Sequence, residues 1–150
     1  MDIVQTVDEA MGTMLLVPDT VTQDEFSYGI TFLNLAAGAR ASGQIIIQAD
    51  ADFLIHNQTQ YSGGASVSAR VIPEVMVMLT DTGSGRKLFS EPLPLDCIFG
   101  TGQLPYILPL PKYMNSRSIL EVEVTNVSAL AVTYASISLA FNGVKVFNKS

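Results

Sequence analysis

Apolar and polar side chains alternate with a period of two along several short stretches of this chain. Residues 26–32, 118–125 and 135–141 show the pattern most clearly, with apolar side chains at every second position. In an extended strand, alternate residues lie on the same face of the sheet. Each stretch therefore predicts a strand with one buried face, and that face has to be covered by another layer.

Further segments extend the predicted sheet structure. Residues 44–48, 51–56 and 144–147 favour strands, and residues 71–80 carry apolar side chains on both faces, as a strand covered on both sides does. Asn142-Gly143 interrupts the last apolar run. This pair readily takes positive φ, so it predicts either a tight hairpin turn or a bulge before residue 144.

The connections have their own signals. Small, polar or glycine-rich residues predict loops over 36–43 and 57–69, the latter exposed, and a turn over 81–85. The proline-rich residues 91–95 exclude a helix there. Three prolines within 105–111 predict an extended or edge strand, because proline has no N–H to donate to a ladder.

About eight short strands with turns between them predict an all-β fold, namely a two-sheet antiparallel sandwich, for which a jelly roll is the most economical architecture. Residues 1–22 have no sustained period, although residues 7–16 are compatible with a short helix through Met11, Met14 and Leu15. We therefore expect an extended N-terminal arm over residues 1–22 and a single sandwich domain over residues 23–150.

Charge is scarce in this sequence. Only 15% of the residues are charged, against about 25% in an ordinary soluble domain. The net charge is −6 and the lysines and arginines are scattered, which argues against nucleic-acid binding. No apolar run reaches the roughly 18 residues that cross a membrane, and the acidic N-terminus does not resemble a signal peptide. We expect a cytosolically synthesised chain that packs apolar surface against a protein partner and binds no membrane.

One enzymatic signature is present, Asp81-Thr82-Gly83-Ser84, because aspartic proteases hold a catalytic carboxylate in an Asp-Thr-Gly turn. Such an enzyme needs two carboxylates that share a proton, so this chain would have to dimerise. The motif continues into Gly85-Arg86-Lys87, which is typical of a solvated hairpin turn with a side-chain bond from the aspartate. We favour the turn and expect no catalytic residue, with a dimeric protease using Asp81 as a remote alternative.

Other reactive side chains are few. We expect His56 to lie at a strand end and bond to backbone, and Cys97 to be a buried, inert thiol. Asp50 and Asp52 are expected on one solvated strand face, and two carboxylates are too few for a calcium site. The sequence therefore predicts no metal, no cofactor and no small-molecule substrate.

Several segments resemble, in order and spacing, small virion proteins of tailed bacteriophages, namely head cement or decoration proteins with a jelly-roll fold. The resemblance begins at Ala51-Asp52-Phe53 and continues through PEVMVMLTDTGSGRKLF, PLPLDCIFGTGQLPYILPLPKYM, SILEVEVTNVSA and YASISLAFNGVKVF. It extends over about two thirds of the chain and leaves out the first 25 residues.

The resemblance implies a structural protein on the capsid exterior, assembled in the host cytoplasm, that binds the major capsid protein, cements neighbouring capsomers and forms a dimer or trimer. Independently of it, the arm, the loop around Tyr61 and the proline-rich edge are the expected contact regions. The expected contact residues are Met11, Met14, Leu15, Leu16, Val17, Tyr61, Pro105, Tyr106, Pro109, Pro111 and Tyr113. A glycan-binding or fibre-attachment module that uses the tyrosines is the alternative, although the chain has no tryptophan.

Overall fold

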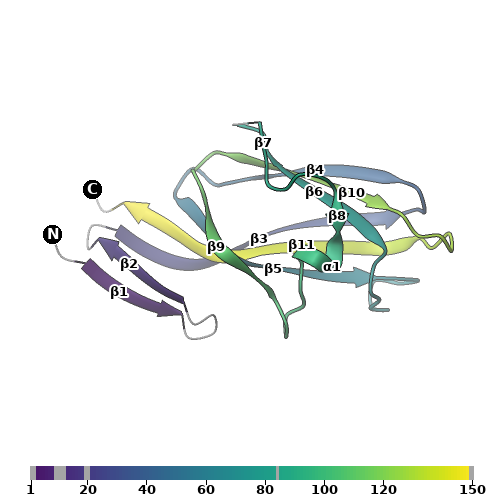
Figure 1. Ribbon diagram of the computed structural model, residues 1–150, viewed down its shortest axis with the longest axis horizontal. Coiled ribbons are helices and arrows are strands. Elements are labelled where there is room, and N and C mark those ends of the chain that lie inside the picture. The colour runs from purple at the N-terminus through teal and green to yellow at the C-terminus, as the bar shows by residue number, and fades with distance from the viewer. Residues whose placement is uncertain (1–2, 9–12, 19–20, 84, 149–150) are drawn as a thin grey trace.

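The computed structural model describes residues 3–8, 13–18, 21–83 and 85–148. Apart from one helical turn, the regular secondary structure of these segments is all β-strand (Figure 1). The strands are β1 (Ile3–Asp8), β2 (Thr13–Pro18), β3 (Val21–Leu35), β4 (Arg40–Ile46), β5 (Asp52–Gly63), β6 (Val75–Asp81), β7 (Arg86–Lys87), β8 (Leu93–Pro94), β9 (Tyr106–Met114), β10 (Ile119–Asn126) and β11 (Tyr134–Asn148). The helix α1 (Leu95–Ile98) is a single turn, and no helix in the described segments is long and apolar enough to cross a membrane.

Two antiparallel sheets form the sandwich. One is four-stranded with the order β3-β11-β5-β9, and the other is five-stranded with the order β4-β10-β6-β7 and β8 also paired with β6. Figure 1 shows the two layers, with β4, β6 and β10 above β3, β5 and β11. The pairs are nested along the chain, since β3 pairs with β11, β4 with β10, β5 with β9 and β6 with β8. This nesting, with successive partners in alternating sheets, is a jelly roll, so the predicted fold class is confirmed.

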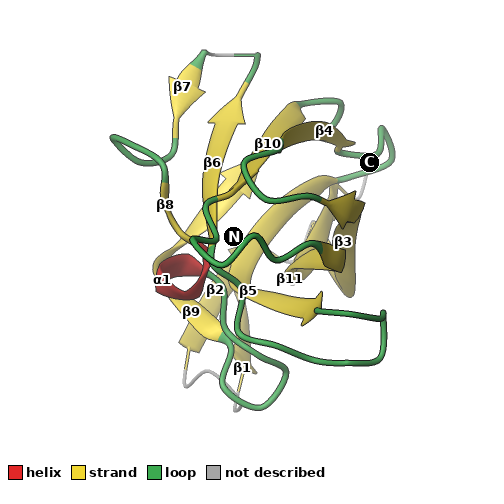
Figure 2. Cartoon of the chain, turned by 90° about the vertical axis from the view of Figure 1, so that its right-hand side faces the viewer, coloured by secondary structure: helices red, strands yellow, loops and turns green. Residues whose placement is uncertain are grey.

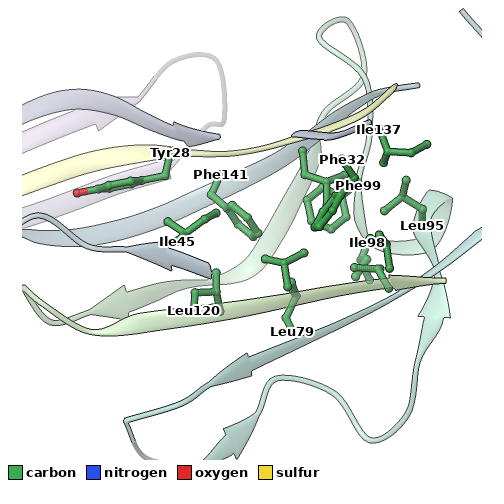
Figure 3. Packing of buried hydrophobic residues seen from close by; sticks show 14 of the residues in the cluster. Tyr28, Phe32, Ile45, Leu79, Leu95, Ile98, Phe99, Leu120, Ile137 and Phe141 are labelled. Carbon is green, nitrogen blue, oxygen red and sulfur yellow. The ribbon is translucent and has the colours of Figure 1, made fainter. Parts of the chain in front are cut away.

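The core lies between the sheets and is built from the alternating residues that the sequence marks as apolar. Along β10, Leu120, Val122 and Val124 are buried, and the residues between them are partly exposed. Figure 3 shows side chains from both layers meeting there, such as Ile45 of β4 and Phe141 of β11. Phe99, which follows α1, packs beside them with its ring centroid 5.5 Å from that of Phe141. Strands with one apolar face therefore stack as predicted.

The N-terminal arm is a β-hairpin. β1 and β2 pair with each other in a separate two-stranded sheet, from Ile3 opposite Pro18 to Asp8 opposite Thr13. The alternative of a short helix over residues 7–16 is therefore wrong. A helix of that length is marginal in water, whereas pairing satisfies the backbone groups of both segments. Figure 1 shows the hairpin at the end of the sandwich where β3 starts.

The exposed loop predicted over residues 57–69 is wrong in its first half, because β5 continues to Gly63. Gln58 and Ser62 of this segment are buried despite being polar. Gln58 Nε2 donates to Ile98 O at 2.7 Å and Ser62 Oγ to Gln60 Oε1 at 2.7 Å. Because these groups have partners inside the protein, a polar strand can be buried at low cost.

Three other boundaries differ from the prediction. β4 begins at Arg40, so the loop expected over residues 36–43 is shorter than predicted. The strand expected over residues 71–80 begins only at Val75 and buries one face, because Pro73 precedes it and Val71 and Ile72 are exposed. The exclusion of helix from residues 91–95 is wrong at its last residue, because α1 begins at Leu95, directly after Pro94. Proline is compatible with the start of a helix.

Asn142-Gly143 forms a bulge and not a hairpin turn. β11 runs straight through it, and the register against β5 shifts there, with Asn142 opposite Asn57 and Gly143 opposite Ile55. A Cβ atom on Gly143 would lie 1.9 Å from the carbonyl oxygen of Leu54. Only glycine permits this approach of the two backbones.

Candidate functional site

The outward face of the four-stranded sheet carries a group of uncharged side chains, which we call the uncharged face. It consists of Ser27, Gly29, Thr31 and Leu33 on β3, Ser138, Ala140 and Asn142 on β11, and Asn57, Thr59 and Tyr61 on β5. The outward face of the other sheet differs, because Arg40 of β4 and Glu123 of β10 form an ion pair there with Nε and Oε1 3.5 Å apart. Depletion of charge is what distinguishes the centre of a protein interface.

Polar groups on the uncharged face bond to one another across the strands. Asn142 Oδ1 accepts a hydrogen bond from Ser27 Oγ at 2.7 Å, and Asn142 Nδ2 donates to Asn57 Oδ1 at 2.8 Å. The hydroxyls of Thr31 and Ser138 are 3.0 Å apart. Covering a polar group costs little when it already has a hydrogen-bond partner. This face can therefore be covered by a partner at low desolvation cost.

The uncharged face contains a hollow of about 540 Å³. Its floor includes Gly29 and Ala140, which stand opposite each other in the register and have the smallest side chains of the face. Tyr61 and Arg70 also line it, with the Arg70 guanidinium 5.2 Å from the centre of the Tyr61 ring. The Tyr61 hydroxyl donates to Ser68 O at 3.3 Å, so this ring is held in place beside the hollow.

The proline-rich segment forms β9, an edge strand of the four-stranded sheet, as predicted. Its exposed apolar side chains are Ile107, Leu110 and Tyr113, which are 42%, 81% and 52% exposed, and Leu104 just before it is 80% exposed. Together we call these four residues the β9 edge. Apolar side chains on an unpaired edge are normally covered by another chain or segment.

The predicted contact residues divide into separate groups. Tyr61 is on strand β5 and not in a loop, and Tyr113 is on the same outward side of the sheet, since it pairs with the non-core residue Leu54. Pro109 is exposed, and Pro105, Tyr106 and Pro111 are partly exposed. Tyr106 is opposite the buried Gln58 and so faces inward. Met14, Leu15, Leu16 and Val17 belong to β2, and Met11 lies outside the described residues.

Sequence reasoning missed Leu104, Ile107 and Leu110. The sequence does carry a signal for them. Prolines confine this strand to the edge of a sheet, where only its inward face is buried. Residues 104–114 contain more apolar side chains than that one face can bury, so some of them must be exposed. It also missed the uncharged face, whose signal is the absence of charged residues between positions 26 and 35 and between positions 134 and 144.

The expectation that Asp50 and Asp52 share one strand face is wrong, because Asp50 lies in the turn before β5 and Asp52 is the first residue of β5. Asp50 lies 3.1 Å from the ammonium of Lys145, whose side chain is buried and stacks over the Phe26 ring. Asp52 accepts hydrogen bonds from the Tyr113 hydroxyl and from Ser116 N. The bond to Asp52, together with burial and the charge of Asp52, raises the pKa of Tyr113 to about 12. In the described part of the chain, no three His, Cys, Asp or Glu side chains gather to hold a metal.

The structure also shows where the other reactive side chains lie, namely Asp81, Cys97 and His56. Asp81 Oδ1 accepts a hydrogen bond from Gly83 N at 3.1 Å and Gly85 has a φ of 67°, so the predicted turn between β6 and β7 is confirmed. Cys97 is exposed, and the expectation of a buried thiol is wrong, because the α1 turn directs Leu95 and Ile98 inward and Cys97 outward. His56 is buried within β5 and not at its end.

Comparison with known proteins gives only distant similarities. No model of a known protein family matches the sequence, and no curated protein matches it. Among solved structures, the chain is similar to VP2 in a subviral particle of infectious bursal disease virus, at 11% identity and a TM-score of 0.36, covering 99% of this chain and 38% of VP2. It is also similar to the structures of the Gt strain, with 9% identity and a TM-score of 0.33, and of the Gx strain, with 11% and 0.32.

In both of these structures the match covers 97% of this chain and 42% of the other. The chain thus spans about two fifths of the length of the proteins that it matches. All three structures are of this one virus, and none is of a tailed bacteriophage. The jelly-roll assignment rests on the nested strand pairing described above.

Proposed function

We propose that this protein is a structural component of a virion, which binds the outside of an assembled phage capsid and cements neighbouring capsomers without catalysing a reaction. The observation that carries the proposal is the uncharged face, with its internally bonded polar groups and the adjoining β9 edge. A surface of this kind favours burial against another protein. The jelly-roll fold and the sequence resemblance to phage decoration proteins support the same role.

Charge explains why this face in particular would be used. The chain has a net charge of −6, which repels other acidic proteins. The uncharged face lacks that repulsion, and Tyr61 and Tyr113 at its margin supply rigid aromatic area, which is enriched at protein interfaces. We propose the major capsid protein as the partner on this face.

Repeated copies would strengthen the attachment. A dimer or trimer that sits on a symmetric shell engages several equivalent sites at once, so weak single contacts combine into stable binding. Light scattering of the purified protein measures this state directly. A monomer at all concentrations would contradict the oligomeric part of the proposal and leave the capsid contact to be tested by itself.

Co-sedimentation with mature shells that lack the protein tests the capsid contact. Thr31→Arg places a charge on the uncharged face, and Ser42→Arg places the same charge on the exposed side of β4 in the other sheet. We expect Thr31→Arg to weaken binding by about tenfold or more, which corresponds to about 1.4 kcal/mol. Ser42→Arg is expected to leave binding unchanged. No saturable binding of the parent chain, or equal losses in both variants, would contradict the proposal.

The hollow beside Tyr61 favours glycan binding as a second candidate function. Thr31, Thr59 and Ser138 line it with hydroxyls, and a sugar is recognised by such groups together with an aromatic ring. Binding on a glycan array that is lost in Tyr61→Ala, with capsid binding intact, would support this candidate. For the protease alternative, the decisive result is acid peptide cleavage that disappears in Asp81→Asn.

A further inference from the structure

A second cavity lies between the two sheets, beneath β9, and has a volume of about 420 Å³. Both layers line it. Ile55 and Leu108 belong to the four-stranded sheet, and Leu79 and Leu93 to the five-stranded one. Ile98 of α1 adds to the wall, and it appears with Leu79 among the core side chains of Figure 3. The cavity therefore continues the hydrophobic core toward the surface at this edge.

The cavity exists because β9 leaves its partner strand over part of its length. Between the paired residues Ile107 and Lys112, the segment 108–111 stands opposite the single residue His56 of β5. Two residues of this segment are prolines, which cannot donate to a ladder. The strand therefore bows away from β5. Figure 2, which looks at the sandwich from one end, shows β9 and α1 together on the side where β8 joins the other sheet.

Lys112 is the one charged residue among the described residues that line this cavity. It stands opposite the buried Ile55, and directly opposed residues share a face, so Lys112 is on the inward side of β9. Gln58, another polar residue of the lining, already donates its Nε2 to Ile98 O. A lysine ammonium is a compact point charge. It lies here on a partly exposed edge strand beside a largely apolar cavity.

We propose that this cavity binds a free aliphatic carboxylate, with the chain between the sheets and the carboxylate at Lys112. An apolar cavity of about 150 Å³ in a protein core suffices for benzene, so about 420 Å³ holds a longer chain. The single negative charge of a carboxylate matches the single positive charge of the Lys112 ammonium. A phosphate head, with a charge of about −1.5 to −2, would add uncompensated charge to a chain of net charge −6. The argument for this ligand does not use capsid binding, although Leu110 belongs both to the cavity lining and to the β9 edge.

Isothermal titration calorimetry of the full chain with hexanoate, octanoate and decanoate, below the concentration of micelle formation, tests the chain part of the proposal. Each methylene group that leaves water tightens binding about fourfold. We therefore expect decanoate to bind roughly fifteenfold more tightly than octanoate. Decanol, which has the same chain without the charge, is expected to bind more weakly than decanoate.

Variants test the position of the ligand. Lys112→Gln is expected to weaken decanoate binding and to leave the affinity for decanol unchanged. Lys87 is an exposed cation on β7 outside the lining, so Lys87→Gln should change neither affinity. Leu88→Trp fills the cavity and weakens both ligands, with thermal unfolding as the check that it folds. Absence of saturable decanoate binding, affinity independent of chain length, or equal effects of the two lysine variants would overturn the proposal. Lys112 would then serve only to keep the edge from pairing with another strand.

Discussion

The Tyr113 hydroxyl donates to the Asp52 carboxylate across the pair β9 and β5, and this contact shows how one side chain joins an edge strand to its sheet. Asp52 also accepts from Ser116 N at 2.7 Å, which ties down the chain just after β9. The phenol is bonded in its neutral form beside a negative charge, so ionisation is disfavoured and the pKa of Tyr113 is raised to about 12. The contact therefore depends on pH.

The pH dependence has a definite sign. The pKa of Tyr113 in the folded protein, about 12, is above its unfolded value of 10.0. The contact thus stabilises the fold fully below pH 10 and is lost as the pH rises toward 12. Tyrosinate absorbance, with Tyr113→Phe subtracted, is expected to show this late titration. Asp52→Ala should return the pKa of Tyr113 toward 10.0. Asp24 is an exposed carboxylate on β3, and Asp24→Ala should leave the pKa of Tyr113 unchanged. A titration that is the same in both variants would contradict the assignment.

Cys97 gives a second prediction at the residue scale. It is the only cysteine of the chain and its side chain is exposed in α1. A thiol reagent is therefore expected to label one equivalent of the native protein without denaturant, because access, and not unfolding, limits the reaction. Mass spectrometry of the labelled protein checks this. Labelling that occurs only in denaturant would show that the thiol is covered in the folded state.

Among the strands, the central strand β10 and the edge strand β9 contribute differently to the protein. β10 pairs on both sides, with β4 and β6, and its inward residues alternate strictly with outward ones. β9 pairs on one side only and interrupts that pairing over 108–111. β10 is therefore held by partner strands on both sides, whereas β9 exposes the apolar side chains of the β9 edge and lines the cavity proposed to bind a carboxylate.

Substitutions at neighbouring positions of β10 test this division. Leu120 is 1% exposed, and Leu120→Ala is expected to lower the free energy of unfolding by about 2–5 kcal/mol, because it removes buried methyl groups and leaves a cavity. Glu121→Ala, on the outward side of the same strand, should change it by no more than about 0.5 kcal/mol. Urea denaturation of both variants measures the difference. Similar losses at the two positions would mean that β10 is not half-buried in this register.

At the scale of the whole molecule, the nested pairing makes the last strand indispensable. β11 lies between β3 and β5 in the four-stranded sheet, so it connects the start of the sandwich to its middle. Most of its contacts join residues far apart in sequence, such as Ile137 with Phe32. Each such pairing closes a long loop, and the chain loses conformational entropy before the contacts stabilise the fold. Folding of such topologies is therefore slow.

Two truncations separate the parts of the molecule. In the described segments, β1 and β2 are paired only with each other. Deletion of residues 1–18 is therefore expected to leave a cooperative thermal transition within a few degrees of that of the full chain. Deletion of residues 134–150 removes the strand between β3 and β5 and should abolish the transition. Circular dichroism during heating distinguishes the outcomes, and loss of folding in the first truncation would show that the hairpin is part of the sandwich.

Much of this could be predicted from local pattern, and the failures have a common cause. The inward faces of β3, β10 and β11 follow directly from alternation. The strand over residues 57–63 could not be predicted in this way, because its buried polar groups bond to distant partners. Gln58, for example, donates to Ile98 O, 40 residues away in sequence. The exposure of Cys97 likewise depends on the orientation of a single helical turn against the core, which a run of apolar neighbours does not reveal.

The sequence by itself determined that the chain is a β-sandwich, where most strands lie, that β9 is an edge and that 81–85 is a turn, because alternation, prolines and glycines act on the nearest neighbours in the chain. Only the tertiary structure decided which strands adjoin, and therefore that Gly29, Ala140 and Thr59 form one uncharged face and that Lys112 faces a cavity. Surfaces and cavities are made by residues that pairing brings together over long separations, and a one-dimensional pattern carries no record of those partners.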